Sequence, residues 1–430
     1  MRRLVSLTTF AALLAVLGPV AAYAAGYAIY EQGAAVLGMA GAGTASVGDA
    51  SALFFNPAAM TELKGTQFQL GATWLSPTTS FAGMNPYPGY GVTEEMNNQN
   101  FFPPAFYLTH QLPKRLTVGA GFNSPFGLGV DWKNPDTFTG SYIVTKATLR
   151  TYDASIGAGY ELNPRWSVGL GGSAVWTGVE LDQRIFQPIP GGGGAQAQVA
   201  KVNLKGNNTV GYGWNAAMLF RPDSTVKVGA YYRSKVVVHE DGPATFNQIL
   251  TGNAAFDAAV AAALPPNQSV QTVLRLPAMW SVGVAWNPAS DWTFEYDLNY
   301  VEWKVFTDLP ITFTTTPAAS QTRVEDYSNS WQVRVGAEHR LPNWTYRFGY
   351  YYDKAAAPQQ SVSPILPDAD RNGPAIGIGL PLAGGKWQLD AYELAIFVSQ
   401  RNTGGVNRDG YDGTYKTFVN AAGVSLEYRF

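Results

Sequence analysis

The chain has no cysteine, few charged residues and only three histidines among its 430 residues. Charged residues make up 14% of the sequence, against about 25% in typical soluble domains. The net charge of −2 gives no reason to expect nucleic acid as a partner. His110, His239 and His339 lack a second histidine or an acid at metal-ligand spacing, and no Gly-x-Ser-x-Gly motif occurs. We therefore expect no enzyme, no metal and no other cofactor.

Long hydrophobic runs are also lacking, apart from one at the start of the sequence. Arg2 and Arg3 precede the apolar residues 4–20, and Ala22-Tyr23-Ala24 fits a signal-peptidase site. This pattern predicts a signal peptide over residues 1–24 and export through the Sec pathway. The run is shorter than the roughly 20 residues of a spanning helix. An exported chain without cysteine must be stable without disulfides.

Most of the remaining sequence alternates between apolar and polar side chains. In residues 415–430, Tyr428, Leu426 and Val424 share one parity, whereas the other parity is mainly polar or small. Residues 291–303 alternate in the same way. Successive side chains of a strand point to opposite faces, so these segments are strands with one apolar face. A sheet can span a bilayer only when it closes into a barrel, because every backbone polar group then has a partner.

Fourteen strand candidates follow residue 66, and the connections between them alternate between short and long. Tight turns such as Pro342-Asn343 alternate with long loops, which we expect near residues 182–208 and 239–270. The second of these contains an Ala-rich helix at residues 254–264, predicted to be an amphipathic cover. Outer-membrane barrels have this alternation and an even strand number. The sequence therefore predicts an all-β fold, a transmembrane antiparallel β-barrel of 14 strands over residues 64–430, closed by pairing of the last strand with the first.

Residues 25–63 are rich in Gly, Ala and Ser and lack sustained alternation. Because both ends of an even-stranded barrel lie on the periplasmic side, this segment would enter the lumen from there. We predict an N-terminal hatch that plugs the barrel. Asn56, Pro57 and Ala58 predict a helix start, with Asn at the N-cap and Pro at the first helical position.

The third strand is interrupted by Asn123, Ser124, Pro125, Phe126 and Gly127. Proline removes a donor from the ladder, and glycine releases the backbone. Two interpretations remain open: an ordinary exit from strand to loop, or a kink that opens a gap in the barrel wall.

Two further groups of residues are candidates for ligand contact. Phe81, Trp132 and Phe138 lie in or beside the long loops, as part of an aromatic girdle or as a first capture site. Arg334 and Arg347 fall on the polar parity of their strands. Such charges are mostly paired inside a lumen, and a minority contact a substrate carboxylate.

The sequence resembles the FadL/TodX family of outer-membrane transporters for long-chain fatty acids and other hydrophobic compounds. The resemblance covers essentially the whole mature chain and is carried by Gly41-Ala42-Gly43, by Asn56-Pro57-Ala58, which is similar to the family's NPA motif, by 276–280 and by 365–371. It implies capture of an apolar ligand by outer loops, passage to an apolar lumenal pocket, and lateral exit at the kink in the third strand. It also implies that Ala25, Gly26 and Tyr27 lie near the ligand.

The predicted function is uptake of hydrophobic compounds across the bacterial outer membrane. Long-chain fatty acids are the first candidate, and monoaromatic or alkane hydrocarbons are the alternative. A diffusion porin would need an open lumen, a barrel lipase or protease would need a catalytic constellation, and an adhesin would lack plug and pocket. The expected partners are the hydrophobic ligand, outer-membrane lipid and lipopolysaccharide, without nucleic acid, and the chain is expected to be a monomer.

Overall fold

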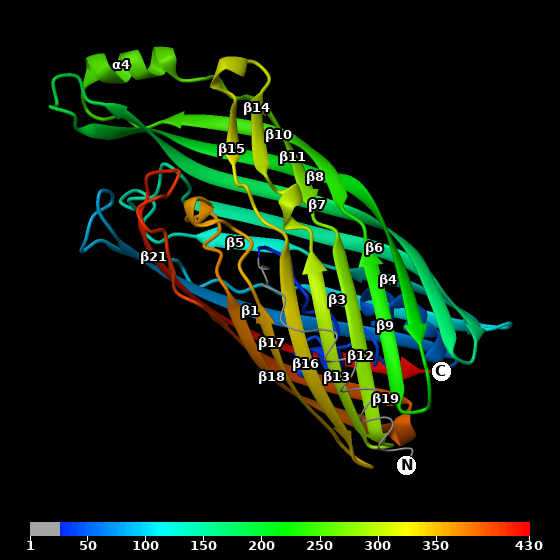
Figure 1. Ribbon diagram of the computed structural model, residues 1–430. Helices are drawn as coiled ribbons and strands as arrows, with labels where there is room; N and C mark the ends of the chain where they lie inside the picture. The colour runs from blue at the N-terminus through cyan, green and yellow to red at the C-terminus, as the bar shows by residue number, and fades with distance from the viewer. Residues whose placement is uncertain (1–25) are drawn as a thin grey trace.

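The computed structural model describes residues 26–430, so the predicted signal peptide and Ala25 lie outside the described residues. Within this range, 14 antiparallel strands form one closed barrel (Figure 1). The strands are β1 (Thr66–Gly83), β3 (Pro104–Leu112), β4 with β5 (Leu116–Asn123, Gly127–Asp131), β6 (Lys146–Asn163), β7 (Trp166–Pro188), β8 (Gln196–Phe220), β9 with β10 (Val226–Arg233, Val236–Gln248), β11 with β12 (Gln268–Leu276, Met279–Ala289), β13 (Trp292–Val301), β16 (Ser330–Arg340), β17 (Thr345–Asp353), β18 (Arg371–Leu382), β19 (Trp387–Val398) and β21 (Gly413–Arg429).

The connections contain the shorter elements. They are β2 (Thr93–Glu95), β14 (Asp308–Phe313), β15 (Gln321–Val324), β20 (Arg401–Asn402), α4 (Ala254–Ala263) and the 3₁₀ turns η2 (Trp303–Val305), η3 (Pro317–Ala319), η4 (Gln359–Ser361) and η5 (Ala383–Gly385). In Figure 1 the long connections and α4 lie at the upper end of the barrel, and tight turns join the strands at the lower end. No helix among residues 26–430 is long and apolar enough to cross a membrane.

The barrel closes where β21 pairs with β1, as the sequence predicted. The register runs without a break from Gln67 opposite Arg429 to Gly83 opposite Gly413. Closure leaves no free sheet edge along these strands, which is the condition for a sheet in hydrocarbon.

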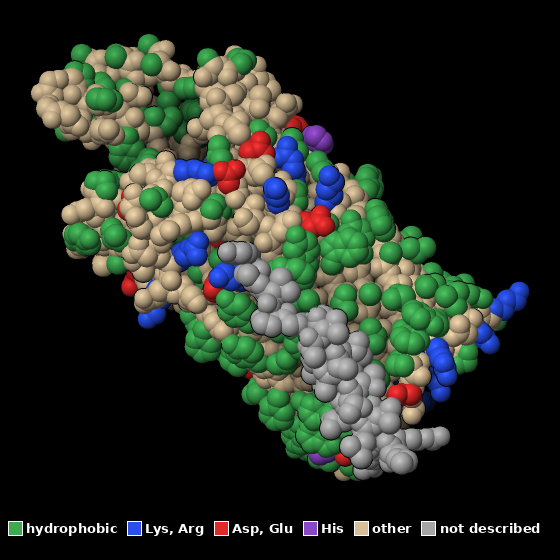
Figure 2. Space-filling view, viewed as in Figure 1, with side chains coloured by type: hydrophobic (Ala, Val, Ile, Leu, Met, Phe, Trp, Pro, Cys, Tyr) green, Lys and Arg blue, Asp and Glu red, His purple; other side chains and the backbone are tan. Residues whose placement is uncertain are grey.

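The outward parity of the strands is apolar. Ile156, Leu170 and Phe348 are more than half exposed, whereas Arg347 on the other parity of β17 is buried. Figure 2 shows hydrophobic side chains over much of the lower wall and charged side chains gathered above them. A band of this kind is the lipid-facing surface of a transmembrane barrel.

The predicted long loop at residues 182–208 is wrong. β7 continues to Pro188 and β8 begins at Gln196, so only a short turn separates them. Asp182 lies in this extension on the same parity as the exposed Leu170, so the outward face changes from apolar to polar along β7. The helix predicted near residue 254 is present as α4, capped by the Asn253 side chain, which accepts a hydrogen bond from the Phe256 N–H at 3.1 Å. Its prediction as an amphipathic cover is wrong, because within the helix Val260 alone is buried.

Residues 26–63 lie inside the barrel and contact strands on opposite sides of it. α2 (Ala34–Gly38) packs on β18 and β19, whereas the 3₁₀ helix η1 (Pro57–Glu62) packs on β6 and β7. The short helix α3 (Ala52–Phe55) precedes η1. Because inward glycines such as Gly349 and Gly169 would place a Cβ within 2.1 and 2.5 Å of this segment, they permit its close approach.

The predicted helix start at Asn56 is confirmed. Its side-chain oxygen accepts a hydrogen bond from the Ala58 N–H at 3.0 Å, and Pro57 occupies the first helical position. The amide nitrogen of Asn56 also donates to the carbonyl oxygens of Thr44 (2.7 Å) and Met218 (3.2 Å). One side chain thus caps η1, folds the segment on itself and fixes it to β8.

Candidate functional site

The third barrel strand is interrupted between β4 and β5. Asn123 pairs opposite Asp153 and Gly127 opposite Arg150, so both halves stay paired with β6 on one side. On the other side β4 pairs with β3 up to Phe122, and no pairing joins β5 to β3 among the described strands. The interruption is therefore a gap in the wall between β3 and β5.

Residues of the N-terminal segment occupy the free edge at this gap. The Ile29 N–H donates to the Pro125 carbonyl at 2.8 Å, and the Gly127 N–H donates to the Tyr27 carbonyl at 2.9 Å. Ala28 and Phe126 form an isolated antiparallel bridge between these two bonds. Ser124, Phe126 and Thr151 add side-chain bonds, since the Thr151 hydroxyl contacts the backbone of Phe126 and the Ser124 hydroxyl donates to the Thr151 carbonyl. The N-terminal segment thus serves as a short replacement strand.

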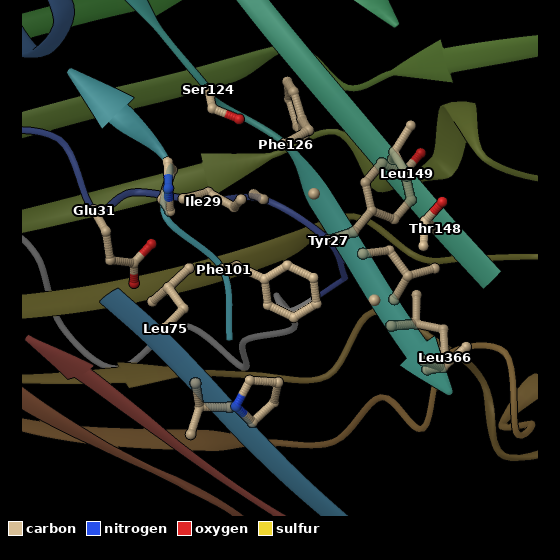
Figure 3. A pocket seen from close by; sticks show the side chains of 18 of the residues that line it. Tyr27, Ile29, Glu31, Leu75, Phe101, Ser124, Phe126, Thr148, Leu149 and Leu366 are labelled. Atoms are coloured by element: carbon tan, nitrogen blue, oxygen red, sulfur yellow. The ribbon is translucent and has the colours of Figure 1, made fainter. Parts of the chain in front are cut away.

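A cavity of about 300 Å³, which we call the wall cavity, lies at the gap (Figure 3). Its inner lining includes Glu31 and Ile396, and its outer lining includes Phe102 and Tyr152, which are 67% and 40% exposed on the barrel surface. In Figure 3 Thr148, Leu149 and Leu366 lie on one side and Glu31 on the opposite side. The wall cavity therefore reaches from the lumen to the lipid-facing wall.

A second cavity of about 160 Å³, the loop cavity, lies under the connections that contain β14 and β15. Most of its lining is aliphatic or aromatic and comes from β6, β8, β11 and the loops, with Ala147, Leu204, Val270, Leu274, Phe306 and Ile311 among the contributors. Tyr27, Leu128, Thr148, Leu149 and Leu366 line both cavities. These five residues form the partition between the loop cavity and the wall cavity.

Tyr27 is held in the partition by aromatic contacts. Its ring lies edge-on to Trp303 at 4.7 Å, Phe306 at 5.6 Å and Phe126 at 6.1 Å, measured between ring centroids. Burial raises the pKa of the Tyr27 hydroxyl, which keeps it neutral. Gly26 has φ 92°, and a Cβ there would lie 2.4 Å from the Trp303 ring, so only glycine fits.

Two side chains anchor Gly26 from the barrel side. The Gly26 N–H donates to Asp368 Oδ1 at 3.0 Å, and Arg371 Nη2 donates to the Gly26 carbonyl at 2.6 Å. Asp368 Oδ2 in turn accepts from the N–H groups of Ala356 and Ala357 at 2.7 and 2.9 Å. Asp368 and Arg371 belong to the 365–371 stretch that carried the family resemblance, and the structure gives them this anchoring geometry.

The charged groups around the loop cavity are arranged in pairs. Arg323 Nε donates to Glu325 at 2.7 Å, while its Nη1 and Nη2 donate to the two oxygens of Asp409 at 3.0 and 2.7 Å. Lys205 pairs with Glu180 at 3.2 Å. Burial raises the pKa of the Glu325 carboxyl, and Arg323 opposes this rise.

The predicted contact residues are distributed over three places. Gly26, Tyr27, Ser124, Phe126 and Gly127 line the wall cavity, and Asn123 and Pro125 flank it at the interruption. Phe81, Trp132 and Phe138 are buried under the outer loops, outside the lining of both cavities. Trp132 and Phe138 stack at 4.7 Å, and Phe81 stacks on Tyr411 at 4.6 Å.

Arg334 and Arg347 also lie outside the lining of both cavities. Arg334 lies over the rings of Tyr30 (4.4 Å) and Tyr351 (4.8 Å) and donates to the Ala40 carbonyl. Arg347 pairs with Glu338 and Asp390, both at 2.6 Å. The geometry assigns Arg334 to holding the N-terminal segment and Arg347 to a buried ion-pair network beside it.

Sequence reasoning missed Leu149, Thr151 and Leu366 as site residues. Leu149 follows the inward parity of β6, which was a signal in the sequence. Thr151 shares this parity, and Leu366 lies in the 365–371 stretch of the family resemblance. Neither position indicated its contacts, because these are made with segments far away in the chain. No group of His, Asp or Glu among residues 26–430 is arranged to hold a metal ion.

A closed barrel with an apolar outer face and apolar cavities inside defines a transmembrane β-barrel of the outer-membrane kind. The sequence model of the family described as outer membrane protein transport protein (OMPP1/FadL/TodX) matches residues 15–430. The chain belongs to this family. This membership confirms the predicted outer-membrane location and transport function, and family members are transporters or channels, not enzymes.

Relatives and solved structures agree with this assignment. The chain is 26% identical over 378 residues to the long-chain fatty acid transport protein of Escherichia coli K12, covering 81% of this chain and 83% of that protein. It is 25% identical over 410 residues to outer membrane protein P1 of Haemophilus influenzae, covering 86% and 85%. The crystal structure of a Pseudomonas aeruginosa FadL homologue aligns with a TM-score of 0.83 at 20% identity, covering 94% of this chain and 99% of that one. The Pseudomonas putida toluene transporter TodX aligns with a TM-score of 0.73 at 17% identity, covering 95% and 99%.

Proposed function

We propose that this chain takes up a hydrophobic compound by moving it from the loop cavity, past Tyr27, into the wall cavity, and out sideways into the membrane through the gap between β3 and β5. The observation that supports this route best is that the wall cavity reaches from the lumen to the lipid-facing residues Phe102 and Tyr152. An apolar ligand would leave directly into hydrocarbon and would avoid about 0.8 kcal/mol of solvation cost for each exposed CH₂ group.

Residues 26–63 act as the hatch in this proposal, and their first residues act as its gate. Tyr27 to Ile29 close the edge at the gap through two backbone hydrogen bonds, which a local movement can break without unfolding the barrel. The ligand is a hydrophobic compound of one of the two classes that the relatives are named for, fatty acids or monoaromatic hydrocarbons. Outer-membrane lipid and lipopolysaccharide surround the apolar wall, and the chain acts as a monomer.

The absence of cysteine from the sequence permits a direct test of the gate. Ala28 and Phe126 form an antiparallel bridge flanked by hydrogen bonds, a pair with Cα atoms about 4.5 Å apart that suits a disulfide. The test uses the variant Ala28→Cys/Phe126→Cys in cells that lack other such transporters. When the variant is oxidised, we expect its uptake rate for radiolabelled toluene or palmitate to fall at least tenfold. Reduction should restore the rate.

The single variant Ala28→Cys is the matched control and should respond to neither oxidant nor reductant. Full uptake by the oxidised double variant, with the disulfide verified by mass spectrometry, would refute movement of this segment as the gate. Loss of uptake that reduction does not reverse would show that the substitution itself damages the site.

A further inference from the structure

We propose that the loop cavity selects a neutral hydrophobic compound about the size of one aromatic ring and excludes carboxylates such as long-chain fatty acids. The inference rests on the proposed function, because it concerns the compound that passes through that route. It follows from the charges that line the loop cavity and from the volume of the cavity.

Neither cation that lines the loop cavity is available to a ligand carboxylate. Arg323 directs Nε to Glu325 and both terminal nitrogens to Asp409, so carboxylates already lie on each side of the guanidinium fork. Two parallel bonds to one carboxylate are the strongest arrangement that an arginine forms. Lys205 is engaged by Glu180 at 3.2 Å. A carboxylate ligand would have to displace one of these partners.

The remaining charge on the lining is negative. Glu240 is 2% exposed, and its carboxyl accepts a hydrogen bond from the Thr177 hydroxyl. Glu240 has no ion-pair partner among the described residues, so it adds an unpaired carboxyl to a lining on which Glu180 and Lys205, and Glu325 and Arg323, are already paired. A further carboxylate would lose its hydration and meet like charge in an apolar space, which favours exclusion.

The volume of the loop cavity favours the same class of ligand. It measures about 160 Å³, close to the ~150 Å³ apolar cavity known to bind benzene. A long alkyl chain has several times as many carbon atoms and would have to cross the partition at Tyr27 and Leu366 into the wall cavity.

Arg371 in the wall cavity already donates to the Gly26 carbonyl. Arg150 lines the wall cavity and not the loop cavity.

The test measures the ratio of palmitate to toluene affinity by equilibrium dialysis of radiolabelled probes against purified protein in detergent. We expect the wild type to bind toluene more tightly than palmitate. Glu325→Gln/Asp409→Asn leaves Arg323 charged and without its carboxylate partners, so the ratio should rise at least tenfold. The milder variant Asp409→Asn is isosteric, changes a residue outside the cavity lining, and should raise the ratio by a smaller factor. Adding Arg323→Met to the double variant should abolish the gain.

The matched control is Asp326→Asn, which changes an acid of the same loop that pairs with Arg408 outside the loop cavity. Its ratio should equal that of the wild type. Barrel folding of every variant is checked by heat-dependent mobility in gel electrophoresis. A wild type that prefers palmitate, or folded Asp409→Asn and double variants with an unchanged ratio, would overturn the inference. If cells take up palmitate but not toluene, the inference about selectivity is refuted and the proposed transport function stands. If cells take up neither compound, the proposed transport function itself is refuted.

Discussion

Gly127 controls the size of the wall cavity at the level of a single side chain. A Cβ at this position would lie 2.6 Å from Cδ1 of Ile29, and both residues line the cavity. The cavity therefore depends on the missing side chain as much as on the interruption of the ladder.

We expect Gly127→Leu to reduce uptake of an apolar probe at least tenfold without unfolding the barrel, because the new side chain fills the route beside Ile29. The measurement is radiolabelled toluene uptake by cells, with folding followed by circular dichroism. The matched control is Gly172→Leu on β7, where the nearest atom to a Cβ is 3.8 Å away and uptake should stay normal. Normal uptake by Gly127→Leu would argue against the lateral route.

Glu31 makes the docking of the N-terminal segment sensitive to pH. Burial raises the pKa of its carboxyl, and Arg334 and Arg371 oppose this rise. A folded-state pKa above the usual value of about 4.3 means that docking is most stable below that value and loses stability as the pH rises through the raised pKa. We expect amide exchange at Tyr27 to Gln32, corrected for intrinsic rates, to increase across this range and to become independent of pH in Glu31→Gln. Equal pH dependence in both proteins would contradict this assignment.

At the level of elements, the N-terminal segment is fixed to the wall by carboxylates of β13. Asp297 Oδ2 accepts from the N–H groups of Gly43 and Thr44 at 2.9 and 3.0 Å, and Glu295 Oε1 accepts from Ala45 N–H at 2.6 Å. These backbone groups have no strand partner in the lumen, so the barrel side chains satisfy them. The inward carboxylates thus accept the backbone hydrogen bonds that a neighbouring strand would accept in a sheet.

We expect Asp297→Ala to loosen the segment, because two buried N–H groups lose their acceptor at a cost of about 1–3 kcal/mol each. Single-channel recordings of Asp297→Ala in planar bilayers should then show more frequent openings than recordings of the wild type. Deletion of residues 25–63 removes the whole segment and should raise the ion conductance sharply. Asp291→Ala, which removes a partly exposed acid paired with His339, is the matched control. Unchanged conductance after the deletion would refute the assignment of the segment as a plug.

For the whole molecule, stability depends on the apolar outer face. Leu170 is 65% exposed on β7, four residues beyond Trp166, whereas Leu162 lies at the end of β6 beside the tight turn. A lipid-facing arginine costs about 2–4 kcal/mol near the bilayer midplane and about 0–1 kcal/mol near the interface.

We therefore expect Leu170→Arg to destabilise the barrel by about 2–4 kcal/mol and Leu162→Arg by less than about 1 kcal/mol. Reversible denaturant unfolding in lipid bilayers measures both values. Equal costs at the two positions would show that the apolar band does not lie where the strand parity places it.

The sequence by itself determined the barrel, its strand number and the closing pair of strands. Alternation is a local property of the sequence. The positions of Phe348 and Arg347 in the alternating pattern therefore indicate which face of the sheet each side chain occupies, without knowledge of the tertiary structure. The extension of β7 and β8 was missed although β8 still alternates there, with Ala200, Val202 and Leu204 buried and Lys201, Asn203 and Lys205 on the other face. What changes in this part is that the outward face becomes polar. Asn56 was recognisable since a helix cap is also local.

The tertiary structure alone decided how the site is assembled. The bonds from Tyr27 and Ile29 to the third strand join residues about a hundred positions apart, and Asp368 reaches Gly26 across almost the whole chain. The pairing of Arg323 with Asp409 likewise depends on two separate loops. No periodicity encodes such contacts, because closure of the barrel brings the segments together. Local patterns therefore specified the wall, and the closed fold specified the cavities, the contacts of the N-terminal segment and the ion pairs around them.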